Sequence, residues 1–391
     1  MSEHPEFDPI AFLETAVQHP SNEDVEDVRE FLVETIRRHA DPSVQVTVDD
    51  HGNTLARTES TAPAAGPHLV FNTHLDTVSP HVPFERDQSG TDGDKSEVIR
   101  GRGACDAKGP LAAMVSAFLS ARPETGRLTL AVTPDEETLS TGAAALTGRL
   151  PGTDDALSGD MYVVGEPTEL DVCTAAKGRF QGTIDLDGVG AHAAEPESGV
   201  NAVAALEGTL TAIRRFDDGA NPHPQLGAPS LVPTTVEGGE STNQVPASCR
   251  LVVDRRPIPP ETADEFRTAL EAAVREEVPD NVGVSFALTD RPSPFLESFA
   301  TDPDHELVKT LSEAAATAAT GDDDCGDVRP FAAATEASYF APAPTVVFGP
   351  GSLADETGPV AHADREYVSV TSVRQAATAL SIAVRELLGR R

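Results

Sequence analysis

The pattern of apolar and polar positions predicts alternating helices and strands over the first third of the chain. Apolar residues recur at helical spacing in some segments, whereas shorter runs between them are almost continuously apolar. The predicted helices cover residues 8–19, 22–40, 107–121 and 140–149, and the predicted strands cover residues 44–49, 68–76, 127–137 and 161–167. Alternation of this kind is typical of a mostly parallel sheet covered by helices on both faces.

Between about Arg179 and Arg291 the pattern changes to that of an α+β unit. The predicted strands here are 180–188 and 250–256, and the predicted helices are 200–217 and 261–278. The first pattern then returns, with a helix at 304–319, a strand at 345–350 and a helix at 370–389. We therefore predict an α/β fold, a mostly parallel sheet sandwiched by helices, with an inserted α+β domain. The catalytic domain would comprise residues 1–178 and 292–391, and the insert residues 179–291.

The composition is that of a globular protein without a membrane partner. No apolar run reaches the roughly 18 residues that span a bilayer, and the first residues lack the pattern of a secretion signal. We therefore expect a cytoplasmic protein. Its four cysteines lack the paired spacing of a thiolate zinc site and are expected to be reduced.

The charge balance points to a salt-rich environment. The 64 acidic and 29 basic residues give a net charge of −35, and no basic stripe is present that could bind nucleic acid. Repulsion between so many carboxylates is screened at molar salt, where the Debye length is about 3 Å. We therefore expect a halophilic protein from a high-salt cytoplasm, with no nucleic-acid partner.

Side chains suited to metal binding follow the predicted strands. His74 and Asp76 stand two apart at the end of an apolar strand, so both point to one face, and Asp76 can accept the second N–H of the imidazole. Asp106 lies in a glycine-rich turn before a predicted helix. Glu136 and Glu137 belong to a run of three carboxylates at the end of the next strand, where burial would require a cation or a proton to offset the charge.

Each of these residues also has an ordinary structural explanation, such as a helix cap for Asp106 or a solvated turn for the acidic run. Glu166 follows another apolar strand, and His362 lies in a late loop. Their joint occurrence is harder to explain in that way. Every one lies past an apolar strand or in a loop, and this is the edge at which α/β enzymes assemble their active sites.

The order and spacing of several short motifs resemble one enzyme family over nearly the whole chain. The motifs are HLDTV, GRGACDAKGP, DEE, GEPT, AHAAEPESGVNAV, NQVP, and FGPG followed by AHADREYV. They are similar to those of the dinuclear zinc amide hydrolases that include succinyl-diaminopimelate desuccinylase, acetylornithine deacetylase, aminoacylase and glutamate carboxypeptidase. The resemblance implies a zinc-peptidase-like catalytic domain, an inserted lid and dimerisation domain, and a homodimer.

The resemblance implies five metal ligands that hold two Zn²⁺ ions in each subunit, with Co²⁺ as the alternative metal. Asp106 would bridge the two ions. His74 and Glu166 would complete one site, and Glu137 and His362 the other. Two cations that share a carboxylate can lower the pKa of a bound water to roughly 7, which suits hydrolysis at neutral pH.

Three catalytic residues are implied in the same way. Asp76 would be the supporting carboxylate, and Glu136 the general base that takes a proton from water and returns it to the leaving amine. His192 in GVGAHAAEP would stabilise the oxyanion from across the dimer, although it is also explained as an ordinary loop histidine. The resemblance further implies a cis peptide bond between Asp106 and Ala107.

Arg179, Asn243 and Arg256 match positions that bind polar groups of the substrate. A planar guanidinium suits a carboxylate because it can bond to both oxygens, whereas a turn and surface ion pairs are the structural alternatives. Arg179 favours a succinylated substrate. The best prediction is therefore hydrolysis of N-succinyl-LL-2,6-diaminopimelate to succinate and LL-diaminopimelate, a step of lysine biosynthesis.

Two features keep other activities open. Ser338 in ATEASYF stands where the desuccinylases carry an arginine, and FGPGSLA is closer to acetylornithine deacetylase, an enzyme of arginine biosynthesis. That deacetylase is the main alternative, followed by a carboxypeptidase or an aminoacylase. A metal-retaining dimeric scaffold and an acidic cation-buffering protein are the non-enzymatic alternatives, and the presence of Glu136 argues against the scaffold.

Overall fold

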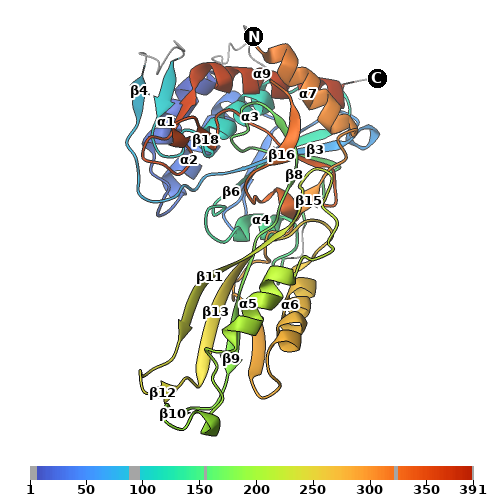
Figure 1. Ribbon diagram of the computed structural model, residues 1–391. Coiled ribbons are helices and arrows are strands. Elements are labelled where there is room, and N and C mark those ends of the chain that lie inside the picture. Colours follow the sequence, from blue (N-terminus) through green and yellow to red (C-terminus); the bar gives the residue numbers. More distant parts are fainter. Residues whose placement is uncertain (1–6, 88–96, 154–155, 321–324, 390–391) are drawn as a thin grey trace.

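The structure is a computed structural model that describes residues 7–87, 97–153, 156–320 and 325–389. One body contains a large sheet with helices on both faces, and a second, narrower body extends from it (Figure 1). The predicted fold class, a mostly parallel α/β sheet with an inserted α+β unit, is confirmed. The exact domain boundaries at residues 178/179 and 291/292 stay a prediction.

The large sheet has nine strands, of which the central ones are parallel. Their order is β1 (Gln45–Val48), β2 (Thr54–Glu59), β6 (Arg127–Thr133), β3 (His68–His74), β7 (Met161–Val164), β17 (Thr345–Val347), β8 (Val172–Ala176) and β15 (Phe299–Ala300), with β16 (Val328–Phe331) also beside β8. The pairs β6–β3, β3–β7 and β7–β17 are parallel, whereas β1 and β2 form an antiparallel edge. Strand β17 follows the insert in sequence and yet lies between β7 and β8.

Helices cover both faces of this sheet. One face packs against α1 (Pro9–Gln18), α2 (Glu26–His39), α3 (Lys108–Ser120), α7 (Glu306–Ala318) and α9 (Val370–Leu388), and the other against α4 (Thr141–Leu146) and α8 (Ala337–Phe340). Successive residues of β3 serve the two cores in turn, because side chains alternate along a strand: Leu69 and Phe71 enter the first core, and Val70 the second. Helix α3 is buried on nearly all sides, as its almost wholly apolar sequence requires.

The narrower body is an antiparallel sheet backed by two helices. The strand order is β11 (Ser230–Gly238), β13 (Ser248–Arg256), β9 (Phe180–Asp187) and β14 (Gly283–Leu288), and the helices are α5 (Leu206–Arg215) and α6 (Ala263–Glu277). Alternate residues of β9 are buried, which is typical of a sheet with one solvated face. Phe180, Phe266 and Phe286 lie at the centre of a hydrophobic core separate from those of the large sheet.

Short elements complete the fold. They are β4 (Glu85–Asp87), β5 (Val98–Arg100) and β20 (Tyr367–Ser369) in a three-stranded sheet, the pairs β10 (Ala191–His192) with β12 (Gln244–Val245) and β18 (Ala354–Asp355) with β19 (Gly358–Pro359), and the 3₁₀ turns η1 (Pro63–Ala65) and η2 (Pro196–Ser198). No helix within the described ranges is long and apolar enough to cross a bilayer. The four cysteines all lie in those ranges and form no disulfide with one another.

The structure differs from the sequence-based expectations at element ends and in strands that were not predicted, among them β2, β8 and β14. The predicted strand 68–76 ends at His74, and the predicted helix 200–217 begins only at Leu206. Strand β11 was not predicted, because it contains Pro233 and exposes most of its residues. Both properties fit an edge strand, in which a missing N–H costs little, and the register shifts just after that proline.

Candidate metal centre

The positions of strand ends bring the predicted metal-binding side chains to one edge of the large sheet. His74 is the last residue of β3, Glu136 lies three residues past β6, and Glu166 lies two residues past β7. These strands are parallel neighbours, so their carboxyl ends meet at the same edge. Asp106 comes from the turn before α3, and His362 from the loop before β20. The peptide bond between Asp106 and Ala107 is cis, as expected.

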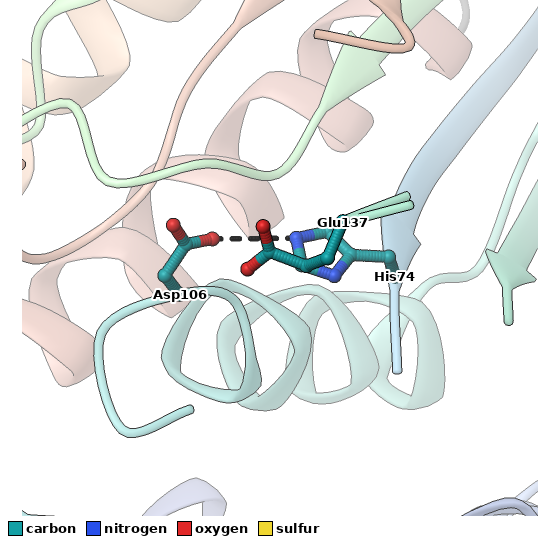
Figure 2. A group of neighbouring side chains, drawn as sticks. All are labelled: His74, Asp106 and Glu137. Carbon is teal, nitrogen blue, oxygen red and sulfur yellow. Dashed lines mark hydrogen bonds and ion pairs between the residues drawn. The ribbon is translucent and has the colours of Figure 1, made fainter. Parts of the chain in front are cut away.

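The nitrogen and oxygen atoms that could bind a metal lie close to one another. Two groups each place their atoms within 4.8 Å of one another: His74, Asp106 and Glu137; and His74, Glu136 and Glu166. His74 Nε2 lies 3.3 Å from Asp106 Oδ1 (Figure 2). His362 Nε2 lies 3.2 Å from Asp106 Oδ2 and 2.9 Å from Glu137 Oε1. Asp106 therefore presents one carboxylate oxygen to each imidazole, and all five predicted ligands lie together with Glu136.

Burial of so many acidic groups changes their proton affinity. Desolvation raises the pKa of Glu136 to about 8 and raises that of Glu166 well above its ordinary value. Burial also opposes ionisation of Asp106, but hydrogen bonds from His362 and His74 outweigh it and lower the pKa of that carboxyl. Hydrogen bonds to Asp106 and Glu137 raise the pKa of His362 to about 10. Protons on the imidazoles thus offset part of the negative charge.

The donor set fits two divalent cations. Four carboxylates share this edge, and within the described residues no lysine or arginine forms an ion pair with any of them, so two imidazoles are their only charged partners. Carboxylates and imidazoles together are ligands that suit zinc and similar transition metals. Two ions of charge +2 would replace the protons and offset the four carboxylates.

Asp76 supports the cluster through the backbone. Its carboxylate accepts the N–H groups of Glu136 and Glu137 at 2.9 and 3.0 Å, which fixes the turn that carries both glutamates. The imidazole of His74 places Nδ1 3.0 Å from the backbone oxygen of Asp76 and 3.3 Å from the nearest carboxylate oxygen. Asp76 therefore contacts the histidine more closely through its backbone oxygen than through the carboxylate that was expected to accept the imidazole N–H. It also fixes the glutamate turn, which the sequence did not indicate.

Arg102 and Glu366 form a buried ion pair that sequence reasoning missed. The Nη1 of Arg102 lies 2.7 Å from Glu366 Oε2, and both side chains are almost completely buried. Glu366 Oε1 accepts the backbone N–H groups of Cys105 and Asp106, each at 3.0 Å. Since Glu366 lies four residues after His362, this carboxylate ties the two loops that carry Asp106 and His362. The sequence did contain a signal for this pair, because Arg102 lies in the motif GRGACDAKGP and Glu366 in the motif AHADREYV.

The cluster lies at a cavity of about 550 Å³ that three arginines also line. Arg179 and Arg256 were predicted to bind substrate, and each places its Nε near Asp254, at 3.4 and 2.7 Å. Arg291 was not predicted. Apolar side chains, including those of Leu296 and Phe331, complete the lining.

The structure does not bring His192 and Asn243 to this cavity. His192 belongs to β10, which pairs with β12, and Asn243 immediately precedes β12. The carbonyl oxygen of Asn243 accepts the N–H of Ala193 at 2.9 Å. This pair of short strands lies at the end of the narrower body that is remote from the large sheet (Figure 1). The two residues are therefore close to each other and far from the metal-binding side chains of the same chain.

The sequence matches a known family and is similar to several proteins named as hydrolases. A model of peptidase family M20/M25/M40 matches residues 70–386. The chain is 31% identical to an acetylornithine deacetylase of Myxococcus xanthus (76% of this chain, 75% of the relative) and 29% identical to a succinyl-diaminopimelate desuccinylase of Granulibacter bethesdensis (76% and 77%). It is also 29% identical, over 92% of both chains, to a Pyrobaculum aerophilum protein named as a LysW-lysine/LysW-ornithine hydrolase.

Solved structures share the fold. An aminopeptidase PepT from Bacillus cereus superposes with a TM-score of 0.73 at 18% identity, covering 97% of this chain and 98% of the other. A Bacillus subtilis protein described as a dinuclear metal-binding peptidase of family M20 gives 0.64 at 15% identity, with 97% of each chain covered.

We predict that Glu366→Gln destabilises the protein by about 3–5 kcal/mol, because it leaves the buried charge of Arg102 without its partner. The free energy of unfolding from denaturant titration measures the effect. Glu277→Gln is the matched control, since it removes an ion pair with Arg215 that is largely exposed and should cost no more than about 1 kcal/mol. Equal losses for the two variants would contradict the structural role given to Glu366.

Without metals, we predict that part of the stability is lost as pH rises. The folded pKa of Glu136 is about 8 and its ordinary value is 4.5, so between these values the folded state binds a proton that the unfolded state has released. The free energy of unfolding therefore falls with pH across that window. Glu136→Gln removes this contribution, so in excess chelator its stability relative to wild type should increase between pH 5 and pH 9. A difference that does not change with pH would contradict the prediction.

Proposed function

The chain belongs to peptidase family M20/M25/M40 and is a metal-dependent hydrolase, and we propose that it cleaves the linear amide bond of an N-acyl amino acid. One observation carries this proposal. A single cavity is lined both by the acidic and imidazole side chains of the candidate metal centre and by three arginines. The first set suits hydrolysis, and the second suits a substrate that carries carboxylates.

We propose that five residues hold two metal ions. Asp106 would be a ligand to both ions, with His74 and Glu166 completing one site and Glu137 and His362 the other. The two oxygens of Asp106, each near a different imidazole, support this division. Zinc is the proposed metal, with cobalt as the alternative, because the donors are carboxylates and imidazoles. Bound there, the metals would supply Lewis-acid activation of water and of the amide carbonyl.

Glu136 is the proposed general base. Its backbone N–H is fixed by Asp76, and its side chain is partly buried beside His74 and Glu166 at the cavity. A carboxylate in that position can take a proton from the attacking water and deliver it to the leaving amine as the C–N bond breaks. Burial favours the protonated form of Glu136, which helps the side chain hold the proton between these two events.

The arginines favour an acidic substrate. Arg179 and Arg256 share the single carboxylate of Asp254, and Arg291 has no acidic partner among the described residues, so two positive charges at the cavity are uncompensated. N-succinyl-LL-2,6-diaminopimelate carries three carboxylates and one ammonium, whereas N-acetylornithine carries one of each. Electrostatic complementarity therefore supports the desuccinylase activity, a step of lysine biosynthesis. Acetylornithine deacetylase, which the relative from Myxococcus xanthus supports, is the alternative.

We further propose that the protein works as a homodimer in the cytoplasm of a salt-rich cell. His192 and Asn243 lie at the remote end of the narrower body, so they can contribute to catalysis only at the cavity of a second subunit. The net charge of −35 supports a high-salt environment, in which repulsion between carboxylates is screened.

Complementation tests the base and the dimer together. Glu136→Gln should keep both metals, measured by atomic emission, and lose at least about 100-fold in kcat. His192→Ala should also lose activity. Subunits of the two variants, unfolded and refolded as an equimolar mixture, should regain about a quarter of wild-type activity, because half of the dimers would then contain one intact site. No recovery on mixing would show that His192 does not act across a dimer.

Substrate choice is tested by steady-state kinetics. With zinc, kcat/KM for N-succinyl-LL-2,6-diaminopimelate should exceed that for N-acetylornithine by at least about tenfold, and activity should rise from 0.2 to 2 M KCl if the salt-rich cytoplasm is correct. Excess chelator should remove the activity, and zinc or cobalt should restore it. Preferential turnover of N-acetylornithine would favour the alternative, and turnover of no N-acyl amino acid would refute the proposed function.

A further inference from the structure

Arg291 reaches the cavity from the segment that leads from β14 back to the large sheet. It lies three residues past Leu288, the last residue of β14, and lines the cavity beside Glu136 and Glu137. Arg179 immediately precedes β9 and Arg256 is the last residue of β13, so Arg291 approaches from a different element.

The guanidinium of Arg291 is held in a defined place. Its Nη2 donates to the backbone oxygen of Leu139 at 3.0 Å and lies 2.9 Å from the hydroxyl oxygen of Ser293. The ring of Phe295 lies beneath it, with its centroid 5.2 Å from the central carbon of the guanidinium. Leu139 is two residues beyond Glu137, so the cation is fixed to the same turn that carries the proposed base.

Its charge and part of its hydrogen-bonding capacity are unused. Within the described residues no carboxylate lies at ion-pair distance from Arg291, and its Nε is buried without an acceptor. Nη1 is not buried and makes no hydrogen bond to the described residues. A buried donor that is left unsatisfied costs about 1–3 kcal/mol. Arg255, an arginine outside the cavity lining, differs in that it is paired with both Asp217 and Glu261.

We propose that Arg291 determines specificity by binding a carboxylate of the substrate, separately from the pair formed by Arg179 and Arg256. This inference rests on the proposed function, because it requires the cavity to hold the N-acyl amino acid. The guanidinium is preorganised by Leu139, Ser293 and Phe295, so it can bind an anion without first breaking a protein ion pair. The bound carboxylate belongs either to the acyl group or to the amino acid, and the kinetic test separates these sources.

The test compares matched substrates in which one carboxylate is absent. An N-succinyl amino acid is compared with its N-butanoyl analogue, which lacks the acyl carboxylate, and with its α-carboxamide, which lacks the other. Arg291→Gln should lower kcat/KM about 10–100-fold, chiefly through KM, for substrates that carry the recognised carboxylate. For the analogue without it, the change should stay below about threefold. Arg291→Lys should give an intermediate effect, because it keeps the charge and loses the planar fork.

Arg149→Gln is the matched control. Arg149 approaches the ring of Tyr339, near which Arg291 also lies, and donates to the backbone oxygen of Ala341, but it does not line the cavity. Its loss should leave the preference among the three substrates unchanged. The melting temperature of each variant in molar KCl shows whether it is folded. If Arg291→Gln does not fold, Arg291→Lys still provides the test.

Two results would overturn the proposal. One is an equal loss for all three substrates, which is expected of a residue that only supports the fold, and the other is no loss for any. Calorimetric binding of succinate and butanoate to the zinc-loaded protein gives a separate readout. Wild type should bind succinate more tightly than butanoate. If Arg291 binds the acyl carboxylate, Arg291→Gln should lose that preference. If Arg291 binds the α-carboxylate, Arg291→Gln should instead bind only α-carboxylate probes, such as N-acetylglycine, more weakly than wild type does. If wild type hydrolyses no N-acyl amino acid, the proposed function fails, whereas equal binding of every probe by both proteins refutes the role of Arg291.

Discussion

The crowding of four carboxylates at one edge of the large sheet is the constraint on which the rest of the site depends. Asp106 and Glu137 lie with His74 in one group of ligand atoms, and Glu136 and Glu166 lie with the same His74 in another. Burial makes each of these charges costly unless a cation or a proton accompanies it. Neighbouring groups offset part of this cost. Both oxygens of Asp106 contact an imidazole, and the carboxylate of Asp76 accepts the backbone N–H groups of Glu136 and Glu137 and lies 3.3 Å from the imidazole of His74.

The same constraint bears on the arginine side chains, which lie around the cluster of carboxylates and not within it. Arg102 is close in sequence to Asp106, but its charge is matched by Glu366, so it orders the loops without neutralising the ligands. The arginines at the cavity likewise make no ion pair with the ligands. Divalent cations and an anionic substrate can therefore each find a partner of opposite charge in one cavity.

Sequence reasoning succeeded where the relevant signal was local. The apolar runs that end near His74, Glu136 and Glu166 predicted which edge would carry the cluster, because parallel strands deliver their carboxyl ends to one side. It could not identify contacts between remote segments. The pairing of Arg102 with Glu366 joins residues 264 positions apart, and Arg291 reaches Leu139 over 152 positions. Ser338 was compared with a family arginine, and the structure buries it in α8 outside the cavity lining, whereas Arg291 supplies a cation from another element.

The position of β17 between β7 and β8 has a consequence for how the chain is made. The sheet cannot be completed, and His362 cannot join the other ligands, until residues well beyond the insert have been synthesised. At about 5–20 residues per second, the ribosome needs about 10–40 s to proceed from Glu166 to His362. During that interval the nascent chain contains the four carboxylate residues but not yet the second imidazole. Completion of the metal centre is thus a late event in biosynthesis, and only a chain translated through His362 can hold both ions in the proposed way.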